Sequence, residues 1–173
     1  MTDPTHEPEP AADVDPDEDV ADMTVVVTER EGRRRIWATG WYRIRPETFV
    51  HHELFFDSDQ INCMYAEQSF KSYLLRRDGR EREAARVGRS HLDDTTEELL
   101  AHERSFAIPI KTVEEIRLRA GSLLFKPKLV IATADRDIEF YHKRRSRDTA
   151  ALADTLRSQY DVDVVESSAS ILR

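Results

Sequence analysis

The sequence predicts one domain of the α+β class that is mainly β, with antiparallel strands and a C-terminal amphipathic helix. Three observations lead to this fold class. Apolar and polar residues alternate in several short runs, turn-forming residues separate these runs, and the period becomes that of a helix near the C-terminus. A chain of 173 residues with 39% hydrophobic residues can bury one sizeable core, whereas two separate domains would each bury little surface.

The first 23 residues differ from the rest in composition. They hold nine acidic residues, no lysine or arginine, and four of the seven prolines. We expect this tail to be disordered, because it cannot bury enough apolar surface to offset the entropy of ordering. A solubilising extension is favoured over an acidic interaction arm. The rest of the chain holds 25 acidic against 26 basic residues, and we divide it into a domain over residues 24–165 and a short C-terminal tail over 166–173.

Two further features of the composition bear on the compartment. A single cysteine, Cys63, excludes an internal disulfide and a cysteine-based zinc cluster. We expect a cytoplasmic location, because the N-terminus carries charge where a secretion signal needs an apolar core and no apolar run approaches the length of a membrane span. Arginine outnumbers lysine 21 to 5 and acids are abundant, which is typical of a GC-rich or salt-adapted, halophilic source.

The first predicted strand is RIWATGWYRIR, residues 35–45. Its even-numbered positions are apolar or small, and its odd-numbered positions include the arginines and both tryptophans. Period two therefore predicts a strand whose even side faces the core. Residues 48–56 and 61–66 are two further strand-like runs, and the DSDQ segment between them supplies turn residues.

Residues 66–104 are predicted to form an insertion of helical or irregular structure. Its first part suits either a helix that presents its aromatic residues on one face or a hairpin that turns at Asp78-Gly79, and we favour the hairpin. Thr95 followed by Glu98 matches a capping box, which predicts a short helix.

The last third of the chain is predicted to be a meander closed by a helix. Strands are expected around Ile108 and Ile116 and over residues 128–134 and 138–142. From Asp148 onward the period is helical. The apolar residues of this helix recur four apart, at Leu152, Leu156 and Tyr160.

The segment IPIKTVEEIRLRAGSLLFKPKLVIATADRDIEFYHKRR and the helix after it resemble the second half of a pleckstrin-homology-like (PH-like) domain of the bacterial PH or GRAM type. Such domains have an Ile-Pro strand, an Ile-centred strand, a Leu-Val-Ile strand, a strand ending in Phe-Tyr and a terminal helix. The resemblance covers residues 105–160 and extends to 35–65 only in strand order, and residues 66–104 depart from it. It implies a bent antiparallel barrel with one end covered by the last helix. It also implies a mostly non-catalytic module that binds lipids, peptides or proteins.

The residues themselves contain no catalytic constellation. The five glycines are too scattered for a phosphate-binding loop, and no nucleophile elbow surrounds a serine. In HHE, residues 51–53, His51 and Glu53 share one side of a strand, so at most two ligands converge where a zinc site needs three or four. We therefore expect a non-enzymatic protein with no cofactor and no metal, and an unrecognised enzyme ranks third.

Both tryptophans fall on the arginine-bearing side of the first predicted strand. The candidate ligand-binding residues of this side are Arg35, Trp37, Trp41, Arg43 and Arg45. Guanidinium groups suit phosphates, and indoles suit a membrane interface or a stacked ring. The arginine spacing also resembles the basic signature with which some PH domains hold phosphoinositide head groups. The commoner alternative is that these aromatic residues pack under the 66–104 insertion.

A second basic cluster follows the last predicted strand, in HKRRSR. Its candidate binding residues, with two lysines of the neighbouring strand, are Lys126, Lys128, Lys143, Arg144 and Arg145. Solvated surface charge is the alternative. The partner we expect is a protein or an anionic membrane surface, and in the latter case the protein is peripheral to the membrane. A nucleic-acid-associated protein that uses the Trp/Arg side ranks second, because the nearly neutral domain lacks the basic charge of a dedicated nucleic-acid binder.

Overall fold

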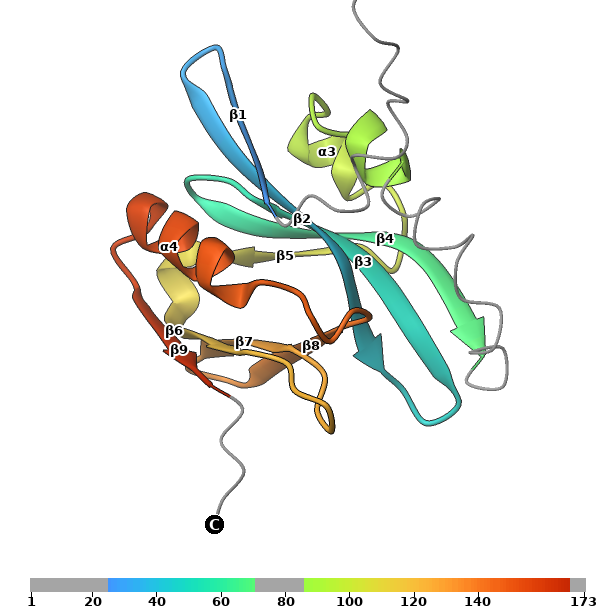
Figure 1. The fold of residues 1–173 in the computed structure, drawn as a ribbon. Helices are drawn as coiled ribbons and strands as arrows, with labels where there is room; N and C mark the ends of the chain where they lie inside the picture. Colours follow the sequence, from blue (N-terminus) through green and yellow to red (C-terminus); the bar gives the residue numbers. More distant parts are fainter. Residues whose placement is uncertain (1–24, 71–85, 169–173) are drawn as a thin grey trace, which may run out of the picture.

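The computed structural model describes residues 25–70 and 86–168 (Figure 1). The described chain is mainly β, as the sequence predicts. Its strands are β1 (Val26–Arg30), β2 (Arg33–Ile44), β3 (Thr48–Phe56), β4 (Gln60–Phe70), β5 (Phe106–Pro109), β6 (Val113–Arg119), β7 (Lys128–Thr133), β8 (Asp137–His142) and β9 (Asp163–Ser167). Its helical elements are α3 (Thr96–Leu99), the 3-10 turn η2 (Ile110–Thr112) and α4 (Thr149–Gln159), and residues 86–90 are helical as well.

All described strands belong to one sheet. Its order is β5-β4-β3-β2-β8-β7-β6-β9, and β1 pairs with β2 off this path. The pair β6–β9 is parallel, and the other pairs are antiparallel. The path ends at β5 and β9, so the sheet is not closed. It is sharply bent, and the half formed by β1 to β5 lies above the half formed by β6 to β9 in Figure 1.

The main hydrophobic core lies between the two halves of the sheet. It contains buried side chains from β2 to β9 and from α4. Leu152 and Leu156 of α4 are almost fully buried there, as the four-residue spacing predicts. Asp148 caps the helix, because its side chain accepts hydrogen bonds from the backbone N–H groups of Ala150 and Ala151. The helix therefore covers one end of the space between the two halves (Figure 1).

A smaller cluster lies on the opposite face of the β2–β4 region. It consists of Trp37, Phe55, Met64 and Leu99, the last from α3. The predicted capping box of α3 is confirmed, because Thr95 accepts from the Glu98 N–H while the Glu98 carboxylate accepts from the Thr95 N–H. The helical segment around α3 thus covers the face of β2–β4 that is turned away from the main core.

A β-bulge interrupts the alternation of β2. The register of β2 against β3 shifts between Ala38 and Trp41, and Gly40 has a φ of +84°. A Cβ atom at Gly40 would lie 2.6 Å from Nε2 of His142, so the position requires glycine on both counts. The bulge moves Trp41 onto the face of Ile36 and Ala38, while Trp37 stays on the other face. The prediction that both tryptophans share one side is therefore wrong.

Two boundaries differ from those predicted. Strand β4 continues to Phe70, so the 66–104 segment begins as regular sheet. Strand β9 pairs in parallel with β6, so the predicted C-terminal tail over 166–173 begins inside a strand. Only Val164 of β9 is buried, and a strand with one buried residue leaves no alternating pattern in the sequence. The acidic tail and the proposed Asp78-Gly79 hairpin lie outside the described residues.

Candidate anion-binding site

Arg35, at the start of β2, is part of a buried ion-pair network. Its guanidinium donates two hydrogen bonds to the Asp57 carboxylate, Nε to Oδ1 at 2.7 Å and Nη2 to Oδ2 at 2.8 Å. Its Nη1 donates to the carbonyl oxygens of Leu92 and Asp94, at 3.1 and 2.6 Å. Asn62 donates a further hydrogen bond to Asp57. Arg35 is only 3% exposed, so it holds the fold together and is not placed to bind a ligand.

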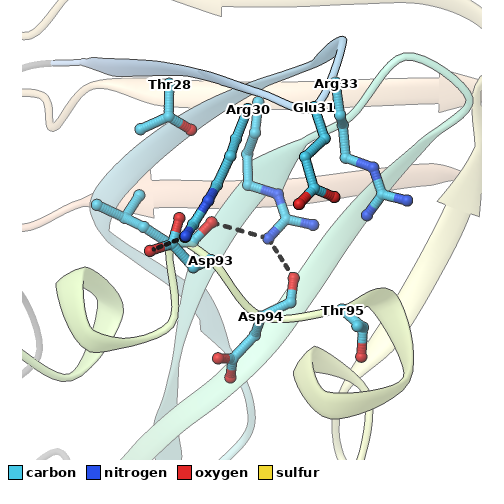
Figure 2. Close-up of a pocket in the computed structure, with 9 residues that line it drawn as sticks. Thr28, Arg30, Glu31, Arg33, Asp93, Asp94 and Thr95 are labelled. Carbon is cyan, nitrogen blue, oxygen red and sulfur yellow. Dashed lines mark hydrogen bonds and ion pairs between the residues drawn. The ribbon is translucent and has the colours of Figure 1, made fainter.

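The surface above this network is a charged pocket between the β1–β2 hairpin and the 92–95 loop (Figure 2). Arg30 from the hairpin forms an exposed ion pair with Asp93 from the loop, at 2.7 Å. Glu31 and Arg33 extend from the same hairpin in Figure 2. Acidic and basic groups are mixed here, so this pocket presents no strong field of either sign.

The two tryptophans are buried, with 2% of each side chain exposed. Trp37 Nε1 donates a 2.6 Å hydrogen bond to Glu53 on the α3 side of the sheet. Trp41 packs in the main core with its ring edge-on to His142. The expectation of an exposed Trp/Arg face is therefore wrong, and the alternative that the aromatic residues are structural fits the observed packing.

The other end of β2 lies beside a second pocket, which has different lining residues. A pocket of about 490 Å3 lies where the end of β2, strand β3, the start of β5 and the β7–β8 turn meet. Its lining residues are Arg43, Arg45, Thr48, Val50, His52, Glu103, Arg104, Ser105, Phe106 and Arg136. Four of them are arginines and one is an acid, so this pocket is positively charged. Arg43 and Arg45 are predicted site residues, and the fold adds Arg104 and Arg136.

Three of these arginines are not neutralised by a carboxylate in the described part of the chain. Arg43, Arg45 and Arg136 form no side-chain ion pair with any residue the structure describes. Arg43 is half-buried and lies over the Phe106 ring, 5.2 Å from its centroid. Burial lowers the pKa of Arg43, and the positive charges of Arg45 and Arg136 lower it further. The positive charges of these arginines thus converge on one pocket, and a bound anion would neutralise them.

His52 forms the inner wall of the pocket and carries no charge near neutral pH. Burial lowers its pKa to about 4. Its ring lies among other rings, 5.4 Å from Phe106 and 5.9 Å from Phe140 between centroids. The positive charge of the pocket therefore comes from the arginines and stays constant over the physiological pH range.

The second predicted cluster lies apart from this pocket. Lys126 donates to the Tyr42 hydroxyl at 2.9 Å, and Lys128 forms a 2.7 Å ion pair with Glu139. Lys143 and Arg144 are half-buried and Arg145 is exposed, in the segment between β8 and α4. None of these five residues lines the pocket of Arg43.

Sequence reasoning missed Arg104 and Arg136 because each stands alone among acidic neighbours. Arg104 follows Glu103, and Arg136 lies between Asp135 and Asp137 in the β7–β8 turn. Both look like ordinary surface charge. The tertiary fold brings them beside Arg43, and no local pattern could have identified them.

In residues 25–70 and 86–168, no group of three or more His, Cys, Asp or Glu side chains could hold a metal ion. Cys63 is fully buried, and burial raises the pKa of its thiol. No described helix is long and apolar enough to cross a membrane.

No protein-family model matches the sequence, and a search of curated proteins found no significant match.

Proposed function

We propose that this chain is a non-enzymatic binding module of the PH-like type that recognises a phosphate-bearing anion. The single observation that carries the proposal is the convergence of Arg43, Arg45 and Arg136, none with a carboxylate partner among the described residues, on one pocket. An arginine guanidinium can donate two parallel hydrogen bonds to two oxygens of a phosphate group. Such charge-assisted hydrogen bonds are stronger than hydrogen bonds between neutral groups.

The order of the elements supports the PH-like part of the proposal. Strands β2 to β5 pair in sequence order as one meander, strands β6 to β8 form a second one, and α4 follows. The bend between the two meanders encloses the main core, and α4 contributes buried side chains to it, which supports the resemblance. Strands β1 and β9 are additions to this plan.

The pocket suits binding of an anion better than catalysis. Its most buried ionisable group, His52, is neutral and packs edge-on against the rings of Phe106 and Phe140. Ser105 Oγ accepts a hydrogen bond from the Tyr65 backbone N–H, which orients the hydroxyl for structural use. The arginines are the main charged groups of the pocket that remain to be considered for catalysis. A permanently protonated guanidinium binds anions but does not transfer protons.

The nucleic-acid alternative loses its main support. It required Trp37 and Trp41 to be available for stacking on bases, and both are 2% exposed. A protein partner remains an outcome of the test, because a phosphorylated or carboxylate-bearing segment would use the same arginines.

The test is calorimetric titration with glycerol 3-phosphate, in parallel with flotation on vesicles that contain phosphatidic acid, which displays the same phosphomonoester on a lipid. We expect the double variant Arg43→Gln/Arg136→Gln to lower the affinity for the ligand more than about a hundredfold, because each lost charge-assisted contact is worth on the order of 1.5 to 3 kcal/mol. The matched control is Arg30→Gln/Arg33→Gln, which removes the same charge at the other end of β2 and should leave the affinity nearly unchanged.

Binding of glycerol 3-phosphate itself would identify the phosphate group as the ligand, and binding only on vesicles would identify a lipid head group. Equal affinity of the Arg43/Arg136 variant and the wild type would refute the proposal. Absence of binding in both arms would refute it too.

A further inference from the structure

The loop that joins β6 to β7 exposes three consecutive large apolar side chains. Leu123 is 90% exposed, Leu124 69% and Phe125 47%. Leu123 and Leu124 are the most exposed large hydrophobic residues in the described part of the chain. Single exposed apolar residues are ordinary on protein surfaces, whereas a contiguous apolar group marks an interaction site.

Backbone hydrogen bonds hold this loop in a defined turn. The Ser122 N–H donates to the Phe125 carbonyl oxygen at 2.8 Å, and the Ser122 hydroxyl accepts from the N–H groups of Leu124 and Phe125. Gly121 lies against the 143–147 segment, since a Cβ atom there would be 2.0 Å from the Arg145 carbonyl oxygen. The turn therefore presents Leu123 and Leu124 at its tip, and in Figure 1 the loop between β6 and β7 projects at the lower edge of the molecule.

Basic side chains surround the base of this tip. Residues 118–130 and 140–147 contain no aspartate or glutamate. The basic residues of these two segments are Arg119, Lys126, Lys128, Lys143, Arg144, Arg145 and Arg147. Arg147 is buried and does not add to the basic surface. The Arg119 guanidinium lies over the Phe125 ring, 5.5 Å from its centroid, so charge and apolar surface are in direct contact. Glu139 offsets one of these charges through its ion pair with Lys128.

We propose that this loop is a membrane-docking element, in which Leu123, Leu124 and Phe125 enter the interface of an anionic lipid bilayer. The basic side chains at the base of the loop would then contact the lipid head groups. The charge complementarity favours an anionic bilayer, because head groups attract a polybasic surface while the acyl boundary accepts the apolar tip. A small convex tip also fits a fluid surface better than a protein partner, which needs an extended complementary patch. The inference does not rest on the arginine pocket, since none of these residues lines it.

The first experiment is cosedimentation with vesicles of phosphatidylcholine that contain phosphatidylglycerol. We expect the wild type to bind these vesicles, and to bind much less to pure phosphatidylcholine or at high salt. The triple variant Leu123→Ser/Leu124→Ser/Phe125→Ser should bind roughly a hundredfold more weakly, because three apolar side chains no longer leave water. Arg145→Gln should weaken binding roughly fivefold, since one exposed charge near the surface is lost.

The matched control is Val27→Ser/Val165→Ser, which removes two exposed apolar side chains elsewhere, 43% and 40% exposed. It should bind vesicles as the wild type does. The triple variant should bind soluble glycerol 3-phosphate as the wild type does, because none of its three residues lines the arginine pocket. Thermal unfolding of all variants checks that folding is intact. We expect only a small loss in the triple variant, because Leu123 and Leu124 are largely in solvent and Phe125 is 47% exposed.

The second experiment is Leu124→Trp fluorescence. The native Trp37 and Trp41 are buried and should respond little to vesicles, so the new tryptophan reports on the loop. Its emission should shift to shorter wavelength on anionic vesicles and be quenched by brominated acyl chains. Vesicle binding unchanged in the triple variant, or no shift at Leu124→Trp, would overturn the inference. The inference would also be overturned if neither the wild type nor the triple variant bound vesicles and the triple variant lost a self-associated state that the wild type forms.

Discussion

The two ends of strand β2 carry the same residue type in opposite roles. Arg35 near its start is 3% exposed and binds Asp57 and two backbone carbonyls. Arg43 and Arg45 near its end have no carboxylate partner in the described structure and line an open pocket. The difference lies in what surrounds each guanidinium. The turn after β3 supplies an acid to Arg35 and the 92–95 loop supplies two carbonyls, whereas the segments around Arg43 supply further arginines.

The bulge at Gly40 separates these two environments. On one side of it, β2 pairs with β1 and β3 beneath the helical segment that contains α3. On the other side, β2 pairs with β3 and briefly with β8, and then its end lies beside the β7–β8 turn. The comparison suggests that stability and binding are divided along the strand, and the following changes test that division.

The largest effect is expected from Arg35→Ala. Removing one partner of a buried pair leaves the Asp57 carboxylate and two backbone carbonyls without their donor, so we expect a loss of about 3 to 5 kcal/mol in the free energy of unfolding. Urea denaturation measures it, with Arg43→Ala as the matched change at the other end. Equal losses in the two variants would contradict the division of roles.

Gly40→Ala should follow, with a loss of about 2 kcal/mol or more. The φ of +84° at this position is costly for alanine, and the new Cβ would lie 2.6 Å from the His142 ring. The same unfolding measurement applies. Because the bulge also sets which face Trp41 occupies, near-ultraviolet circular dichroism should change as well. An unchanged spectrum and an unchanged midpoint would show that the bulge is not needed to separate the two ends.

The pH dependence of stability should show a maximum near pH 6.5. Burial raises the pKa of Glu53 to about 8, above its ordinary 4.5, so the native state keeps a proton that the unfolded state loses and stability falls as pH rises from 4.5 to 8. Burial lowers the pKa of His52 to about 4 and of His142 to about 3, from 6.5. The stability that these two histidines contribute is fully present above pH 6.5. It is lost as the pH falls from 6.5 to about 4 for His52 and to about 3 for His142.

Above pH 6.5 the contribution of Glu53 to the pH dependence of stability exceeds that of the two histidines. One retained proton corresponds to a slope of about 1.4 kcal/mol per pH unit. Glu53→Gln should flatten the alkaline side of the profile, and His52→Gln should flatten part of the acidic side. Thermal unfolding between pH 5 and 8.5 measures both. An alkaline slope that persists in Glu53→Gln would assign it to another group.

The sequence predicted the elements better than it predicted their surfaces. The predicted strands, the cap of α3 and the buried stripe of α4 follow from local patterns and are present, whereas β1 and β9 were not predicted. The exposure of the tryptophans could not be read in the same way, because one glycine bulge reverses the faces of β2 after residue 40. Nor could the sequence separate Arg35 from Arg43, since their different partners come from segments more than twenty residues away.

The smallest effect on stability is expected at the arginine pocket. Arg45 and Arg136 are exposed and unpaired with carboxylates in the described residues, so exposed charge contributes little to folding there. Arg45→Gln and Arg136→Gln should each change the free energy of unfolding by less than about 0.5 kcal/mol. Each change should raise the free energy of unfolding slightly at low salt, because it removes a charge that repels Arg43. Burial and these basic neighbours lower the pKa of Arg43. Added phosphate should raise the thermal midpoint of the wild type more than that of either variant. A loss of several kcal/mol in either variant would mean that this end of β2 is structural after all, and the contrast with Arg35 would disappear.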